Sequence, residues 1–175
     1  MKHRYLSILL ASVISLALLC SCSKEQSNTD VLSDYLGDYS YSDPAVCMVY
    51  EPVEDEFDDN GKPFYGIQYR EVKDLDGLLV SGNTLLLYFY SSMDSRSGIM
   101  TASVEDVAQL YDGKLHVLML DAMEYRALLE KYDINAVPEF VLIKAGQKDQ
   151  VFESSTYDYW TINDVVLWLQ SNGIA

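Results

Sequence analysis

Few side chains in this chain are of types that could do chemistry. Asp94 and Ser97 stand one helical turn apart at the expected start of a helix, where a carboxylate and a hydroxyl could act together in hydrolysis. Such a pair needs a base, but the chain offers only His3, near its beginning, and His116, inside an expected strand. We therefore predict that Asp94 caps the helix and that Ser97 bonds to the backbone of its first turn. We expect no hydrolytic triad and lean against an enzyme.

The remaining reactive side chain is the thiol of Cys47. Its neighbours Val46 and Met48 are apolar, and no Lys, Arg or His lies within several residues of it. An apolar setting raises a thiol pKa and makes the thiol less reactive. We expect a structural cysteine, with a single-thiol redox centre at Cys47 as the alternative.

The first residues have the pattern of an export signal. Lys2 and Arg4 precede a mostly apolar run, Tyr5–Leu19, which is short for a membrane span. The run ends in Leu19-Cys20-Ser21-Cys22, which resembles a bacterial lipobox with Cys22 as the lipidated residue. We therefore predict a signal peptide over residues 1–21 and a membrane anchor through an acylated Cys22. A plain secretory signal is the alternative.

Removal of residues 1–21 would leave an acidic chain with one free thiol. The mature chain has ten Lys and Arg against 27 Asp and Glu, a net charge of −17. This charge argues against nucleic acid as a partner. With Cys22 acylated, only Cys47 remains, so we expect neither an internal disulfide nor a cysteine metal site. The predicted location is the bacterial cell envelope, at the outer membrane facing the periplasm or on the extracytoplasmic face of the plasma membrane.

The mature chain divides into a tether and one domain. Residues 22–43 are rich in Ser, Asp and Tyr, which predicts a flexible tether, although Leu32 and Leu36 could belong to a short turn that docks on the domain. Residues 44–175 then form the domain, with a core from about residue 64.

The domain begins with two expected strands, Ala45–Val53 and Phe64–Val72. The segment between them contains many acids, but the calcium-loop pattern fails because Ile67 stands where a bidentate Glu is needed. Asn60-Gly61 is instead a strong turn signal. We therefore predict a hairpin with solvated acids and no metal site.

From Leu85 onward the pattern predicts strand, helix, strand, helix, proline, strand, strand and helix. The apolar runs Leu85–Tyr90 and Leu115–Leu120 suit buried strands, and the helix between them requires a parallel pair. The strands Phe140–Lys144 and Gln150–Ser154 are joined by a tight turn, so they should be antiparallel. The predicted fold class is α/β, with a central mixed sheet between two layers of helices.

This part of the chain resembles the thioredoxin family. Leu85–Tyr90 is similar to the strand before the family's active site, and Lys131–Pro138 resembles the family's Lys-Tyr-x-Ile-x-x-x-Pro segment. The resemblance covers roughly residues 64–175. It implies a thioredoxin-like three-layer α/β/α fold and a cis bond between Val137 and Pro138, opposite the helix that begins near Asp94.

The departures from the family pattern are concentrated at its active site. Asp94 and Ser97 occupy the positions of the two cysteines, Met93 replaces the usual preceding Trp, and Tyr88 falls at the position of the buried Asp. The dithiol and its proton acceptor are thus lost together, which leaves no dithiol mechanism.

The sequence thus predicts a redox-inactive, lipid-anchored protein that binds an unidentified envelope protein or peptide and needs no cofactor. The predicted groove combines residues from the altered motif and from the proline loop: Met93, Asp94, Ser95, Arg96, Ser97, Val137 and Pro138. The alternatives are disulfide exchange by Cys47 and a purely structural envelope lipoprotein.

Overall fold

The computed structural model describes residues 31–175. The predicted signal peptide, the acylation of Cys22 and the first part of the tether lie outside the described residues, so they stay predictions.

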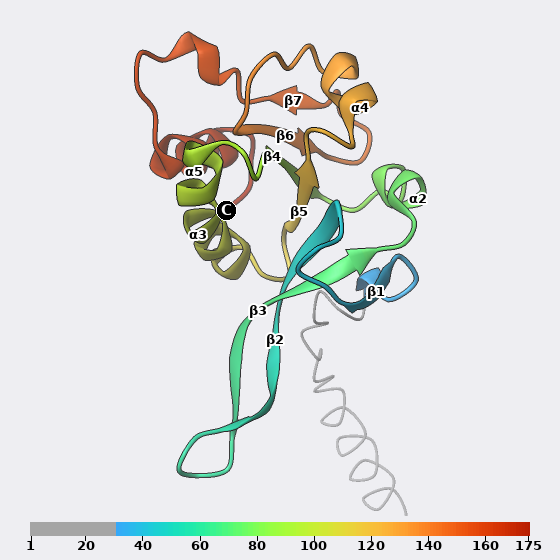
Figure 1. Cartoon of the computed structure of the whole chain (residues 1–175), viewed down its shortest axis with the longest axis vertical. Helices are drawn as coiled ribbons and strands as arrows, with labels where there is room; N and C mark the ends of the chain where they lie inside the picture. Colours follow the sequence, from blue (N-terminus) through green and yellow to red (C-terminus); the bar gives the residue numbers. More distant parts are fainter. Residues whose placement is uncertain (1–30) are drawn as a thin grey trace, which may run out of the picture.

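The described chain is built on one mixed sheet in the strand order β1-β3-β2-β5-β4-β6-β7 (Figure 1). The parallel pair is β4 with β5, and β6 is antiparallel to β7, as the connections predicted. The strands are β1 Leu36–Tyr39, β2 Ala45–Phe57, β3 Pro63–Val72, β4 Leu85–Tyr90, β5 His116–Asp121, β6 Glu139–Ile143 and β7 Gln150–Val151.

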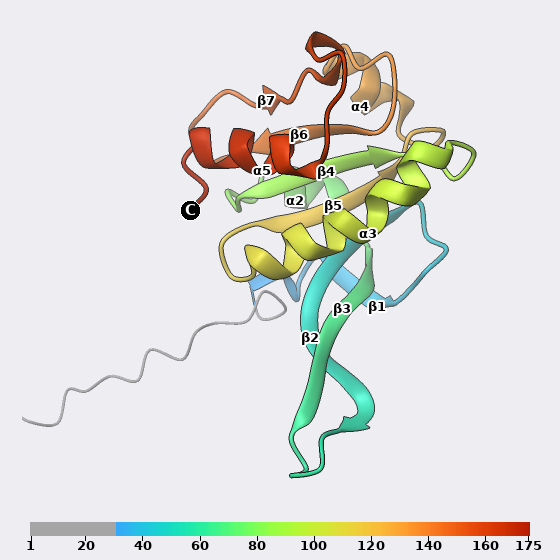
Figure 2. The same cartoon turned by 90° about the vertical axis from the view of Figure 1, so that its left-hand side faces the viewer.

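Helices cover both faces of the sheet, which confirms the three-layer prediction. One face carries α3 and α5, which lie side by side in both views (Figures 1 and 2), and the other carries α2 and α4. Their bounds are α2 Leu75–Leu79, α3 Ser95–Leu110, α4 Arg126–Lys131 and α5 Ile162–Ser171.

Each face of the sheet has its own core because side chains alternate along the strands. Leu86 and Tyr88 of β4 pack under α3 and α5, whereas Leu87 and Phe89 pack toward α2 and α4. An aromatic cluster fills the first core, where Phe140 stacks on Tyr88 at 5.1 Å between ring centroids. The buried run Leu85–Tyr90 thus forms an inner strand between β5 and β6 that is covered on both faces, as predicted.

Part of the segment expected in the tether belongs to the folded body. Leu32 is fully buried, and β1 pairs with β3 through Leu36 and Val72. The expectation of a flexible tether up to residue 43 is therefore corrected for residues 32–39. Their apolar side chains cover the α2 face of the sheet, in line with the docking turn that was the alternative.

Two further boundaries differ from those expected. Strand β7 ends at Val151 because Glu153 adopts a left-handed conformation with φ 56°, after which a 3-10 turn covers Ser154–Thr156. The first hairpin is longer than expected, since β2 continues to Phe57.

This hairpin projects from the body as a two-stranded arm (Figures 1 and 2). Along β2, pairing with β5 ends at Met48. Along β3, Tyr69 is the residue nearest the hairpin turn whose carbonyl accepts a backbone N–H from the segment after β1. We call residues 49–68 the hairpin arm. Asp58 fixes its turn by accepting the backbone N–H groups of Asn60 and Lys62 at 2.8 and 2.9 Å.

Candidate functional site

The start of α3 is held by Asp94, as the sequence predicted. Its backbone is extended, and its Oδ2 accepts the backbone N–H of Ser97 at 2.6 Å. The hydrogen bond from the Ser97 backbone is the main reason that the pKa of Asp94 lies below its ordinary value. A carboxylate here is stabilised by the free N–H groups of the first turn, so Asp94 stays ionised and acts as a cap.

Ser97 is buried and its hydrogen bonds also stabilise the start of α3. Its hydroxyl accepts the backbone N–H of Ser91 at 3.3 Å, and its carbonyl accepts the hydroxyl of Tyr88 at 2.8 Å. Burial raises the pKa of Tyr88 to about 12, so this phenol remains a neutral donor. The Ser97 hydroxyl is therefore closed off from any substrate, and the hydrolytic interpretation of Asp94 and Ser97 has no accessible nucleophile.

The side chain of Arg96 contacts the C-terminal part of the chain. Its guanidinium lies 4.2 Å from the centre of the Trp160 ring and donates to the Trp160 carbonyl at 3.3 Å. It also moderates the pKa of Glu139, which burial raises above its ordinary value. This contact leaves no local signal in the sequence, because 64 residues separate the two partners. Met93 and Ser95 are exposed beside it.

The proline loop forms one wall of a shallow hollow. The peptide bond between Val137 and Pro138 is cis, as the resemblance implied, and Pro138 is buried. Within residues 31–175, the backbone N–H and carbonyl of Val137 form no hydrogen bond. The hollow has a volume of about 320 Å³ and is lined by Ser91, Ala122, Met123, Arg126, Leu129, Ile134, Asn135, Ala136 and Val137.

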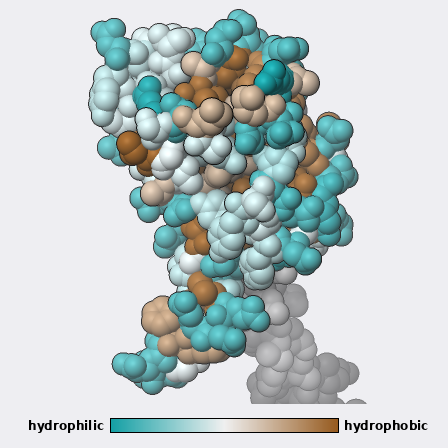
Figure 3. Space-filling view, viewed as in Figure 1, coloured by the Kyte–Doolittle hydropathy of each residue, from teal (hydrophilic) through white to brown (hydrophobic). Residues whose placement is uncertain are grey.

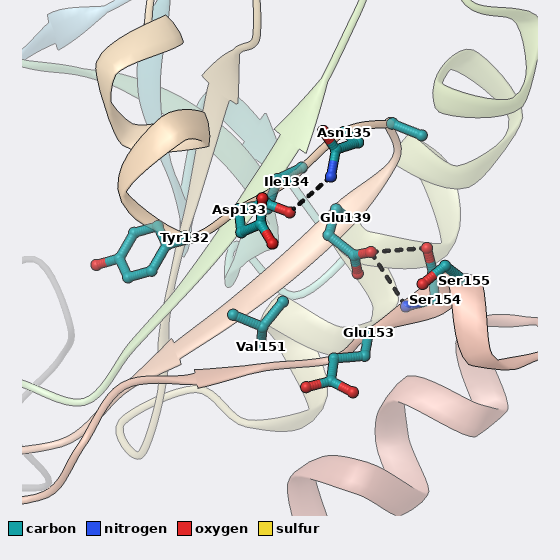
Figure 4. A pocket seen from close by; sticks show the side chains of 10 residues that line it. Tyr132, Asp133, Ile134, Asn135, Glu139, Val151, Glu153, Ser154 and Ser155 are labelled. Carbon is teal, nitrogen blue, oxygen red and sulfur yellow. Dashed lines mark hydrogen bonds between the residues drawn. The ribbon is translucent and has the colours of Figure 1, made fainter.

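A second hollow, of about 330 Å³, lies on the other side of the proline loop (Figure 4). The buried Glu139 accepts the backbone N–H and the hydroxyl of Ser154 at 3.1 and 2.7 Å, which fixes the 3-10 turn to the start of β6. The carboxylates of Asp133 and Glu153 also line this hollow. Neither Glu139 nor Ser154 was a predicted site residue, because nothing near them in the sequence indicates that they meet.

Cys47 and His116 lie away from these hollows, inside the sheet. Cys47 is 1% exposed, and burial raises the pKa of its thiol to about 12. Burial lowers the pKa of His116 to about 4, so the imidazole is neutral near pH 7. Among residues 31–175, no group of three or more His, Cys, Asp or Glu is placed to hold a metal ion.

The predicted groove residues thus divide between two neighbouring surfaces. Val137 lines the hollow beside α4, whereas Ser95 and Arg96 line an apolar groove of about 410 Å³ against Tyr159 and Trp160. Asp94 and Ser97 support the start of α3 and line neither the hollow beside α4 nor the apolar groove against Trp160.

A model of the thioredoxin family matches residues 71–161, more than half of the chain. The chain belongs to the thioredoxin family. The altered motif and the proline loop both lie inside the matched segment, whereas the hairpin arm lies before it.

Similar proteins include further thioredoxins. The chloroplast protein thioredoxin Y1 of Arabidopsis thaliana is 28% identical over 80 residues, which span 46% of each chain, so less than half of that relative is covered. Among solved structures, the thioredoxin of Fasciola hepatica is 21% identical with a TM-score of 0.44, over 58% of this chain and 92% of that one. The oxidised mitochondrial thioredoxin 3 of Saccharomyces cerevisiae is also 21% identical, with a TM-score of 0.41, over 56% and 82% of the two chains.

Across residues 31–175, no helix is both long enough and apolar enough to span a bilayer.

Proposed function

We propose that this thioredoxin-fold protein binds an extended segment of another envelope protein beside its proline loop, without dithiol chemistry. The observation that supports binding is the hollow next to Val137, where apolar side chains lie beside an unpaired backbone N–H and carbonyl. An extended peptide gains affinity from main-chain hydrogen bonds and specificity from pockets for its side chains. Arg126, at the rim, offers a positive charge to an acidic or C-terminal carboxylate of the peptide.

The absence of dithiol chemistry is supported by the groups that occupy the cysteine positions. Asp94 is ionised and serves as a cap, and Ser97 is buried, so neither offers a reactive atom. Disulfide exchange by Cys47 is opposed by its environment, because a thiol with a pKa of about 12 is almost wholly protonated near pH 7 and is covered by the sheet.

The proposal keeps the membrane anchor at Cys22. Because Leu32 is already buried in the body, only the nine residues from Ser23 to Val31 would connect the domain to the lipidated cysteine. A chain of that length reaches at most about 30 Å. The domain would therefore stand close to the membrane surface, where it would meet partners embedded in or attached to the same membrane.

The binding proposal is tested by photocrosslinking in the native envelope. A photoreactive side chain at Met123, which lines the hollow, should give a discrete adduct, whereas the same group at the exposed Leu167 of α5 should not. The substitution Ala136→Trp fills the hollow and should abolish the adduct. Its matched control, Ala145→Trp, places the same bulk on an exposed turn elsewhere. An adduct that persists in Ala136→Trp would contradict the proposal.

The redox part of the proposal is tested separately by reduction of insulin disulfides. The wild-type protein should show no catalysis above the background of the reductant. Catalysis that disappears in Cys47→Ser would instead establish the single-thiol alternative.

A further inference from the structure

The outer part of the hairpin arm is not covered by the rest of the described fold. Beyond Met48 and Tyr69, β2 and β3 pair only with each other, so both edges of the arm are open. Val49 and Glu51 at its base are buried, whereas residues 52–65 are mostly exposed. The six residues 63–68 of β3, at roughly 3.3 Å each, carry the arm about 20 Å from the body, because the additional residues of β2 lie in the irregularity between Pro52 and Phe57. An isolated two-stranded hairpin is marginally stable in water. A projection of this length is therefore not required by the packing of the body.

One face of the arm is aromatic. In the register, Tyr50 opposes Ile67, Pro52 opposes Tyr65, and Phe57 opposes Pro63, and opposed residues share a face. Phe57 and Tyr65 are 58% and 53% exposed, and the rings of Tyr50 and Tyr65 lie 5.7 Å apart. Figure 3 shows hydrophobic and hydrophilic residues side by side on the arm. Aromatic side chains left in water on a projecting element indicate a contact surface.

The same arm has a strong negative charge. Residues 49–68 contain six Asp and Glu and a single basic residue, Lys62. Asp58 is needed for the turn, but the carboxylates of Glu54, Glu56 and Asp59 form no salt bridge or hydrogen bond within residues 31–175. Their charges favour a cationic partner and repel a second copy of this acidic chain.

At the base of the arm, an aromatic ring and a carboxylate together hold a cationic side chain. The Arg70 guanidinium lies 5.0 Å from the centre of the Tyr39 ring and 3.7 Å from a carboxylate oxygen of Glu51. A ring and a carboxylate together hold a guanidinium through cation–π attraction and an ion pair. Toward its tip, the arm repeats exposed rings and carboxylates without an arginine of its own.

We propose that the hairpin arm docks a Lys/Arg-rich, extended segment of a partner protein on its aromatic face. Lysine and arginine would lay their apolar stems along Phe57 and Tyr65 and place their charges beside the acids. Addition of a strand at the edge is disfavoured, because Pro52 and Pro63 lack an N–H and the register is broken between Pro52 and Phe57. This surface lies outside the family-matched segment and is independent of the hollow beside Val137.

The test uses the full chain in mild detergent and a fluorescent peptide in which lysine alternates with valine, followed by anisotropy. The arm variant combines Glu54→Lys, Glu56→Lys and Asp59→Lys. A matched body variant combines three exposed acids, Glu124→Lys, Glu130→Lys and Asp158→Lys. Each triple substitution changes the net charge by six units, from −15 to −9. Thermal unfolding of both variants verifies that they remain folded.

The arm variant should bind the peptide at least tenfold more weakly than wild type, and the body variant less than about threefold more weakly, since screening limits the effect of distant charges. A peptide with glutamate in place of lysine should not bind. Equal losses in the two variants, or no binding by wild type at low salt, would overturn the proposal.

Two further measurements separate the aromatic face from charge alone and from self-association. The double substitution Phe57→Ser with Tyr65→Ser keeps the charge and should weaken binding severalfold, so unchanged binding would overturn the role of the rings. A dimer seen by sedimentation that the arm variant abolishes would make a second copy the occupant and would also overturn the proposal. Ala136→Trp should leave peptide binding to the arm unchanged, which separates this test from that of the proposed groove.

Discussion

At the start of α3, Asp94, Arg96 and Ser97 of the altered motif each have a partner inside the protein, whereas several carboxylates toward the tip of the hairpin arm face solvent without a partner among residues 31–175. Asp94 caps the helix, Ser97 bonds to Ser91 and Arg96 stacks on Trp160. In the arm, by contrast, Glu54 and Glu56 have no partner among residues 31–175.

This difference separates two uses of polar residues. Where a family's reactive groups have been replaced by residues that satisfy one another, the replacements stabilise the scaffold and need no substrate to explain them. Where exposed acids form no ion pair or hydrogen bond among residues 31–175 and lie beside exposed rings, as on the arm, folding does not account for them, whereas the proposed external contact would. Recognition is therefore proposed beside the proline loop and on the arm, rather than at the positions that correspond to the family's cysteines.

The largest expected effect tests whether the body alone determines stability. Phe140 is fully buried and stacks on Tyr88, so Phe140→Ala should lower the free energy of unfolding by about 3–5 kcal/mol. Phe57→Ala, the same change on the exposed face of the arm, should alter it by less than about 0.5 kcal/mol. Urea denaturation measures both. A large loss in Phe57→Ala would show that the arm is part of the core.

The second effect is a pH dependence of the unfolding free energy that a buried histidine causes and an exposed carboxylate of the arm does not. Burial lowers the pKa of His116 from 6.5 to about 4, so the unfolded chain takes up this proton first as the pH falls. Stability from this group is complete above pH 6.5 and is lost between pH 6.5 and about 4, by about 3 kcal/mol in total.

The variant His116→Gln should remove this loss. The free energy of unfolding, measured by urea denaturation at pH 7 and at pH 4, should fall less in the variant than in wild type. The arm substitution Asp59→Asn is the control and should leave the wild-type profile nearly unchanged over the same range. An identical pH profile in His116→Gln would show that the imidazole is not buried.

The third effect concerns the thiol in the sheet. Cys47→Ser places a hydroxyl in an apolar setting and should cost about 1–3 kcal/mol of unfolding free energy. The same burial should make the wild-type thiol unreactive toward a disulfide reagent until the protein unfolds. Rapid labelling of the native protein would contradict the geometry on which the redox argument rests.

The outcome for the fold shows what periodicity can predict. The continuous apolar run Leu85–Tyr90 forms the inner strand β4, as expected, because burial on both faces leaves a signal in the strand's own sequence. The segment around Leu32 was placed in the tether because its few apolar residues are separated by polar ones, and only their contacts with β3 and α2 bury them. The arm's length was missed because its acids are typical of a loop.

The outcome for the site follows the same rule. Asp94 was predicted as a cap because a helix N-terminus and its acceptor lie within four residues. The contacts of Arg96 with Trp160 and of Glu139 with Ser154 were not predicted, because they join segments that only the tertiary fold brings together. The aromatic face of the arm was likewise hidden, since it depends on the register between β2 and β3.

The smallest effect compares one carboxylate from each region. Asp94→Ala removes the cap of α3 and should lower the melting temperature by a few degrees at pH 7, whereas Asp59→Ala in the arm should leave it unchanged. Because the pKa of Asp94 lies below its ordinary value, its contribution is complete at neutral pH and is lost as the pH falls through the lowered pKa. Melting curves of Asp94→Ala and wild type should therefore approach each other only in strong acid. If Asp94→Ala and Asp59→Ala changed the melting temperature equally at pH 7, the contrast between a carboxylate that caps a helix and one that faces solvent would be wrong.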